Sequence, residues 1–96
     1  MKKISEEIKK SAEPIIKVIR KNDGFKVMAI GLNKGVILKK HKAPENAKLL
    51  IIKGTVSYVS EREKVCLETF DEYNIPVGEL HELIAIEASI CLLIIG

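Results

Sequence analysis

Residues 15–32, IIKVIRKNDGFKVMAIGL, contain two runs of β-branched and aliphatic residues on either side of Asn22-Asp23-Gly24. Residues of these types favour strands, and Asp-Gly between two such runs is a strong short-range signal for a β-hairpin. The stretch therefore predicts two antiparallel strands joined by a tight turn.

The rest of the chain repeats this pattern. Short apolar or alternating runs are found at residues 36–40, 48–53, 55–60, 65–70, 81–87 and 89–96, with turns expected at 33–35, 54 and 61–64 and an irregular stretch at 71–80. Roughly eight short strands at this spacing are typical of an antiparallel sandwich or barrel. One helix is expected, over residues 3–13, because Ile4 and Ile8 share a helical face and Pro14 ends it.

Composition argues against two classes of partner. The 16 basic and 13 acidic residues nearly balance, and the chain has two arginines, four aromatic residues and no tryptophan. Nucleic-acid binding relies on guanidinium groups and stacking aromatics, so we expect no nucleic-acid partner. No run reaches the length of a membrane span, and the N-terminus lacks the apolar segment of a signal peptide. We therefore expect a cytoplasmic protein with no membrane partner.

Two further features concern burial. Cys66 and Cys91 stand within apolar runs without CxxC spacing, so both are expected to be small buried hydrophobic residues. Residues 49–52, 83–86 and 90–95 are apolar at consecutive positions, although a strand with one face in water should alternate. The predicted helix is too short to cover these second faces. We therefore predict a homodimer that buries the outer face of one sheet.

The spacing of a few residues resembles the two-part signature of the cupin family. Gly35, five residues and then His41 match the start of the first motif, and Gly54 matches its end. The second motif, Pro-x-Gly-x-x-His, matches residues 76–81 and ends at His81. Asp71 stands where the family has the second residue of a Gly-Asp pair, with Phe70 in place of the glycine.

This resemblance implies an all-β fold, a cupin-type jelly-roll barrel (double-stranded β-helix) with a short N-terminal helix. It implies a single domain over residues 1–96, with the helix and lead-in at 1–14 and the motif region at 35–81. The family binds a metal with three histidines and one glutamate. Ala43 and Ala47 occupy two of those four positions, so His41 and His81 remain. Two imidazoles alone would hold a divalent metal weakly, unless Glu45 or Glu79 adds a carboxylate.

Three classes of function stay open. A binding module would hold a small molecule in the barrel mouth around His41 and His81, with Tyr58 and Lys40 as further contacts; this is the preferred prediction. The molecule would be anionic if the lysines at 39, 40, 42 and 48 attract it, although lysines also protect strand edges. Tyr58 alternates with Val56, as a core residue would.

The second class is an enzyme. It would be a metal-dependent isomerase or dioxygenase of the cupin type with an incomplete ligand set. A metal-free version would use one histidine as a general base, oriented by Asp71, Glu79 or Glu82. The third class is a regulatory or assembly partner that acts through its apolar sheet face.

Overall fold

The computed structural model describes residues 12–42 and 46–96, and within them the side chains of Lys40 and His41 are not described. Nine strands occur in these residues: β1 Ile15–Asn22, β2 Phe25–Leu32, β3 Ile37–Lys42, β4 Ala47–Lys53, β5 Thr55–Ser60, β6 Lys64–Glu68, β7 Glu72–Ile75, β8 Leu80–Ala85 and β9 Ser89–Ile95.

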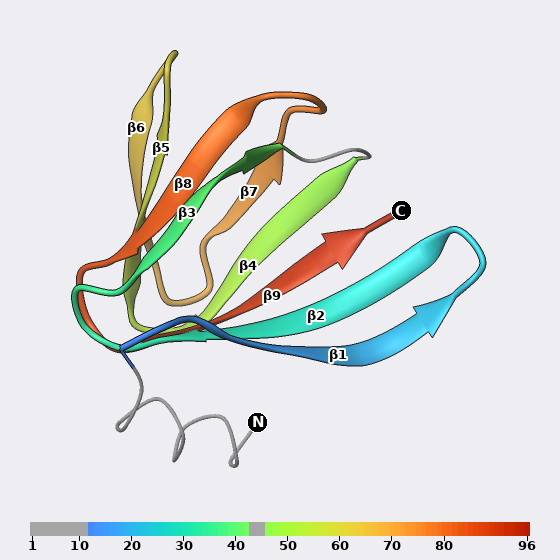
Figure 1. Ribbon diagram of the computed structural model, residues 1–96, viewed down its shortest axis with the longest axis horizontal. Helices are drawn as coiled ribbons and strands as arrows, with labels where there is room; N and C mark the ends of the chain where they lie inside the picture. The colour runs from blue at the N-terminus through green and yellow to red at the C-terminus, as the bar shows by residue number, and fades with distance from the viewer. Residues whose placement is uncertain (1–11, 43–45) are drawn as a thin grey trace.

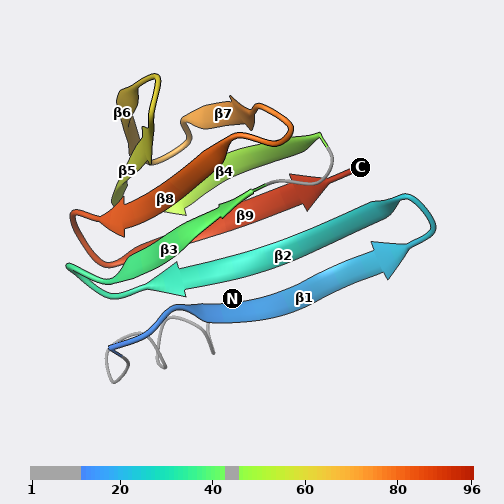
Figure 2. The same cartoon turned by 45° about the horizontal axis from the view of Figure 1, so that its top comes forward.

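The strands form two antiparallel sheets that face each other (Figure 1). The first sheet has the order β1-β2-β9-β4-β7, and the second has the order β3-β8-β5-β6. Figure 2 shows β1 at the outer edge of the larger sheet, next to β2, which separates it from β9. The predicted all-β architecture is confirmed.

Local predictions from turn residues are also confirmed. The first hairpin pairs Asn22 with Phe25 across Asp23-Gly24, and Gly24 has a φ of 75°. Gly35 (φ 81°) and Gly54 (φ 98°) lie between strands as expected. The predicted helix at 3–13 lies outside the described residues, except that residues 12 and 13 form a bend. Among the residues that are described, no helix is long and apolar enough to span a bilayer.

Two predictions were wrong. Residues 71–80 are not irregular throughout, because residues 72–75 form β7 and pair with β4. This strand was missed because Glu72 and Asn74 have low strand propensity and only Tyr73 and Ile75 alternate with them. Cys66 is exposed rather than buried. Its neighbours Val65 and Leu67 face the core, so the two-residue period of β6 turns Cys66 outward.

The core lies between the sheets. Its fully buried side chains come from both layers, with Ile30, Leu49 and Ile51 from the first sheet and Val56, Tyr58 and Leu83 from the second. Tyr58 is therefore a core residue, as its alternation with Val56 indicated.

The consecutive apolar runs have a specific place in this arrangement. The runs of β4 and β9 lie on adjacent strands of the first sheet. Alternate residues of each run face the core, while Ile52 and Leu92 pack in a second cluster around Ala29 and Ile90. Both faces of these two strands are thus apolar, which is the feature that motivated the predicted homodimer.

Candidate functional site

A β-bulge sets the positions of the two histidines. Leu38 pairs with Leu83 and His41 pairs with His81, so two residues of β3 stand opposite one residue of β8. Without the extra residue, Lys40 would stand opposite His81. A shift of one position would also turn every following side chain of β3 to the other face of the sheet. The motif spacing predicted that these two positions, forty residues apart in sequence, approach each other. The bulge brings their backbones into direct register.

His81 is held firmly. Its side chain is 2% exposed, and its ring lies 5.1 Å from the ring of Tyr58 with an interplanar angle of 20°. Its Nδ1 lies 3.0 Å from the backbone oxygen of Glu79. A carbonyl oxygen only accepts, so Nδ1 donates, and in the neutral imidazole Nε2 is then the acceptor nitrogen.

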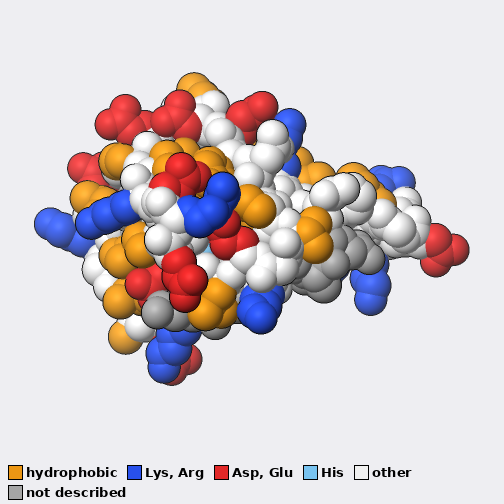
Figure 3. All heavy atoms as spheres, turned by 90° about the horizontal axis from the view of Figure 1, so that it is seen from above, with side chains coloured by type: hydrophobic (Ala, Val, Ile, Leu, Met, Phe, Trp, Pro, Cys, Tyr) orange, Lys and Arg blue, Asp and Glu red, His pale blue; other side chains and the backbone are white. Residues whose placement is uncertain are grey.

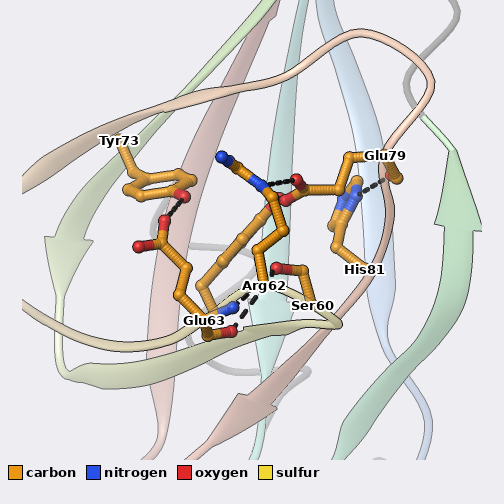
Figure 4. Close-up of polar contacts among 7 residues, drawn as sticks. Ser60, Arg62, Glu63, Tyr73, Glu79 and His81 are labelled. Carbon is orange, nitrogen blue, oxygen red and sulfur yellow. Dashed lines mark hydrogen bonds and ion pairs between the residues drawn. The ribbon is translucent and has the colours of Figure 1, made fainter.

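Several hydrogen-bonded polar side chains lie near His81 (Figure 4). The Tyr58 hydroxyl donates to Glu79 Oε1 at 2.8 Å, and Arg62 Nε donates to Glu79 Oε2 at 2.7 Å. Tyr73, whose ring centre is 4.3 Å from that of Tyr58, donates its hydroxyl to Glu63 Oε1. Seen from the end of the molecule that carries the β5–β6 turn, acidic and basic side chains lie next to one another (Figure 3).

These contacts alter proton affinities in consistent directions. The hydrogen bond from Arg62, and then the one from Tyr58, lower the pKa of Glu79, and the same ion pair raises the pKa of Arg62. Burial, followed by the Glu79 carboxylate, raises the pKa of Tyr58. Burial and Glu63 raise the pKa of Tyr73 to about 12. At neutral pH Glu79 is therefore a carboxylate, Arg62 is a guanidinium, and both tyrosines are uncharged phenols.

A cavity of about 850 Å³ lies between the sheets, lined by residues of both. We call it the intersheet cavity. Its lining is mostly apolar among the described residues, which contribute Lys39, Lys42, Glu13 and the buried His81 as ionisable groups. The apolar lining comes from residues 12, 14, 16, 28, 30, 37, 38, 47, 75, 93 and 95. A cavity of this size, with few polar groups among many apolar ones, is typical of small-molecule sites.

The structure separates the other predicted site residues. Tyr58 is 0% exposed and does not line the intersheet cavity. Glu79 lines a different surface hollow, together with Arg62 and Lys42. Lys48 is in an ion pair with Glu72 at 3.5 Å, away from the cavity lining. Lys40 lies in the bulge of β3, and Glu45 is outside the described residues.

Sequence reasoning missed most of the cavity wall. Ile16, Met28, Leu93 and Ile95 come from β1, β2 and β9, far from the motif residues in sequence. The signal that was available is the alternation in these strands, which gives the inward-facing residues once the strand order is known. The strand order itself is not readable from local pattern.

The described residues do not supply a metal-binding set. No group of three His, Cys, Asp or Glu side chains among them gathers closely enough to hold an ion. Ala47, at one of the family's ligand positions, is 7% exposed and lines the intersheet cavity with a methyl group. The described residues therefore do not fit the metal set that the family uses.

Comparison with known proteins bears on the fold. No family model matches the sequence, and no curated protein matches it. Solved structures do match. A cupin superfamily protein from Desulfitobacterium hafniense has a TM-score of 0.80 at 15% identity, covering 85% of this chain and 75% of that one. The chain has the cupin fold.

Two further solved structures have a similar TM-score. A conserved protein of unknown function from Streptococcus pyogenes has a TM-score of 0.78 at 22% identity, with 85% and 72% of the two chains covered. KdgF from Halomonas has a TM-score of 0.76 at 17% identity, with 84% and 76% covered. Identities this low establish the cupin fold and leave the function to be argued from the site.

Proposed function

We propose that this chain is a binding protein that holds a small molecule with an apolar body and an anionic group in the intersheet cavity. The observation that supports this most is the cavity itself, about 850 Å³ and lined mostly by aliphatic side chains. An apolar body would be driven into it by the hydrophobic effect, at roughly 25 cal/mol for each Å² removed from water.

The charged groups at the cavity favour an anion. Lys39 and Lys42 are exposed residues of β3 that line the cavity, and Glu13 is the acidic residue among its described lining. Exposed lysines contribute modestly to affinity because water and salt screen them, so their main effect is selectivity and orientation. The anionic group of the ligand would lie toward β3, with its apolar body toward β2 and β9.

His81 gives the cavity its polar interior. Its ring orientation is fixed by Glu79 and Tyr58, so binding a ligand would not need to order this side chain. A fixed side chain costs less entropy on binding than a mobile one. The His81 Nδ1 is oriented by a backbone oxygen, whereas the general base outlined above would be oriented by a carboxylate, so we favour binding over catalysis.

Calorimetric titration with octanoate and with octan-1-ol tests this proposal. Octanoate should bind more tightly than the alcohol, and Lys42→Gln should reduce octanoate affinity by up to about fivefold while leaving the alcohol unchanged. Met28→Gln places a polar group in the apolar wall and should weaken both. Lys64→Gln, on exposed β6, is the matched control and should weaken neither.

Two results would contradict the proposal. Failure of both probes to bind the folded protein would show that the cavity does not accept an apolar body. Binding that Met28→Gln leaves unchanged would show that the probes bind elsewhere.

A further inference from the structure

Phe70 is an exposed aromatic residue in an unfavourable backbone conformation. Its side chain is 79% exposed and its φ is 71°. L-residues with a β-carbon rarely adopt this region, and a bulky residue there is a true outlier. It also stands where the family pattern has glycine, the residue that adopts this conformation without strain.

The surrounding turn holds this conformation in place. The Phe70 amide donates to the backbone oxygen of Ile51 at 2.7 Å, and the Asp71 amide donates to the oxygen of Glu68 at 2.8 Å. Asp71 Oδ2 in turn accepts from the Glu68 amide at 2.8 Å. These hydrogen bonds hold the strained conformation in place, yet burial of the ring offsets little of its cost because the ring is exposed. A strained residue whose cost is not offset within its own chain points to a role outside the folding of that chain.

The turn that carries the ring is acidic in sequence, although Lys53 lines the same surface hollow as Glu68 and Thr69. Residues 68–72, which we call the Phe70 turn, contain Glu68, Asp71 and Glu72 and no basic residue, a formal charge of −3. Lys48 pairs with Glu72 at 3.5 Å, while Glu68 and Asp71 are exposed. A partner for this turn must offer apolar surface together with positive charge.

The chain itself carries such a surface. Residues 17–26, which we call the hairpin surface, contain Lys17, Arg20, Lys21 and Lys26 against Asp23, a formal charge of +3. Within it Val18, Ile19 and Phe25 are 53%, 54% and 39% exposed. Ile19 is the extra residue of a bulge, since Val18 pairs with Met28 and Arg20 with Val27. Two adjacent apolar side chains are thereby exposed on an edge strand.

We propose that this chain forms a homodimer in which the Phe70 turn of each protomer docks on the hairpin surface of its partner. Charge disfavours the simpler pairings, because turn against turn brings the exposed Glu68 and Asp71 of both copies together, and hairpin against hairpin joins two surfaces of formal charge +3. A two-fold axis allows each surface to contact its complement, so two equal contacts form and the assembly closes at two copies. The dimer does not depend on a ligand in the intersheet cavity.

Sedimentation of purified protein with Phe70→Gly is the main test. Glycine adopts a φ of 71° without strain, so the variant should fold at least as stably as the wild type. Removal of the aromatic anchor should still weaken dimerisation by roughly tenfold or more. Val77→Ser, which trims another side chain that is 55% exposed, should leave dimerisation unchanged. A monomeric wild type at micromolar concentration, or a folded Phe70→Gly that dimerises like the wild type, would overturn the proposal.

A charge exchange tests the partner surface independently of Phe70. Arg20→Glu and Glu68→Lys should each weaken dimerisation, and the two together in one chain should restore it, because the opposite charges meet again across both contacts. The wild-type dimer should also weaken between about 0.05 M and about 0.5 M salt, as exposed charges are screened. A double variant as weak as the two single changes combined would show that the surfaces do not meet.

Discussion

Strand β5 joins two unlike regions. At its start, contacts run to the backbone: the Gly54 amide donates to Thr69 Oγ1 at 3.1 Å and the Thr55 amide donates to Ser89 Oγ at 3.0 Å. At its other end, Ser60 pairs with His81, and side chains contact side chains through Tyr58, Arg62 and Glu79. We call these the Gly54 end and the His81 end.

The difference concerns what a substitution would change. At the Gly54 end the backbone at residue 54 lies so close to residues 88–89 that a β-carbon does not fit between them. A larger residue there must therefore move a neighbouring strand. At the His81 end the polar side chains are coupled by charge, so substitutions there should alter hydrogen bonding and pH dependence while the strands stay in place. The cavity and its histidine belong to the second kind of region.

Gly54→Val should give the largest effect. A β-carbon at this position would lie 2.2 Å from Ser89 Oγ and 2.5 Å from the backbone oxygen of Ala88, at a φ of 98°. Strain and overpacking together should cost roughly 2–5 kcal/mol of unfolding free energy. Lys64→Ala, on exposed β6, should change it by less than about 0.5 kcal/mol. Equal thermal midpoints for the two variants would show that the close approach at Gly54 is not required.

Tyr58→Phe should have an intermediate effect at the His81 end. The phenol is fully buried and loses its hydrogen bond to Glu79, which should cost roughly 1–2 kcal/mol, since bonds to charged groups exceed the typical value. The ring that stacks on His81 remains. Denaturant unfolding measures the loss, and an unchanged midpoint would mean that the Tyr58–Glu79 bond contributes nothing to stability.

Phe70→Gly should have a smaller effect of opposite sign. Relief of the left-handed conformation outweighs the greater freedom of glycine in the unfolded chain, so a gain of roughly 0.5–1 kcal/mol is expected. It should be measured on the monomer at low protein concentration, because loss of the dimer contact would otherwise mask it. A destabilised monomer would show that the Phe70 ring packs on its own chain.

Much of the fold could be predicted from the sequence because it is encoded locally. Asp23-Gly24 and the alternation in residues 55–60 depend on near neighbours, and the strands they predict are present. The strand β7 was missed because it is formed by pairing with β4 rather than by propensity. Phe70 was noted where the family has glycine, but its positive φ depends on hydrogen bonds to a distant strand.

The site was predictable in part for the same reason. Motif spacing brought His41 and His81 together, although the bulge that puts them in register left no mark in the sequence. The ion pair of Arg62 with Glu79 joins two turns that are seventeen residues apart, and no pattern indicated it. Side-chain networks of this kind depend on tertiary geometry, which single-sequence patterns do not contain.

The smallest expected effect is a pH dependence at the His81 end. Arg62 and Tyr58 lower the pKa of Glu79 below its ordinary value of 4.5, so the carboxylate stabilises the fold above that pH. The contribution should disappear as pH falls through the lowered pKa, because the folded state must then bind a proton there. Unfolding measured against pH should therefore show the wild type losing its advantage in stability over Glu79→Gln below about pH 4.5.

Arg62 is the largest cause of the lowered pKa of Glu79, so Arg62→Gln should raise that pKa toward 4.5. The NMR signal of the Glu79 carboxyl carbon would follow this change. Because the Arg62 side chain is 65% exposed, the change in stability should be slight even where the shift in pKa is clear. A Glu79 signal that titrates identically in the wild type and in Arg62→Gln would mean that the ion pair does not hold in solution, and the contrast between the two ends of β5 would then rest on Tyr58 alone.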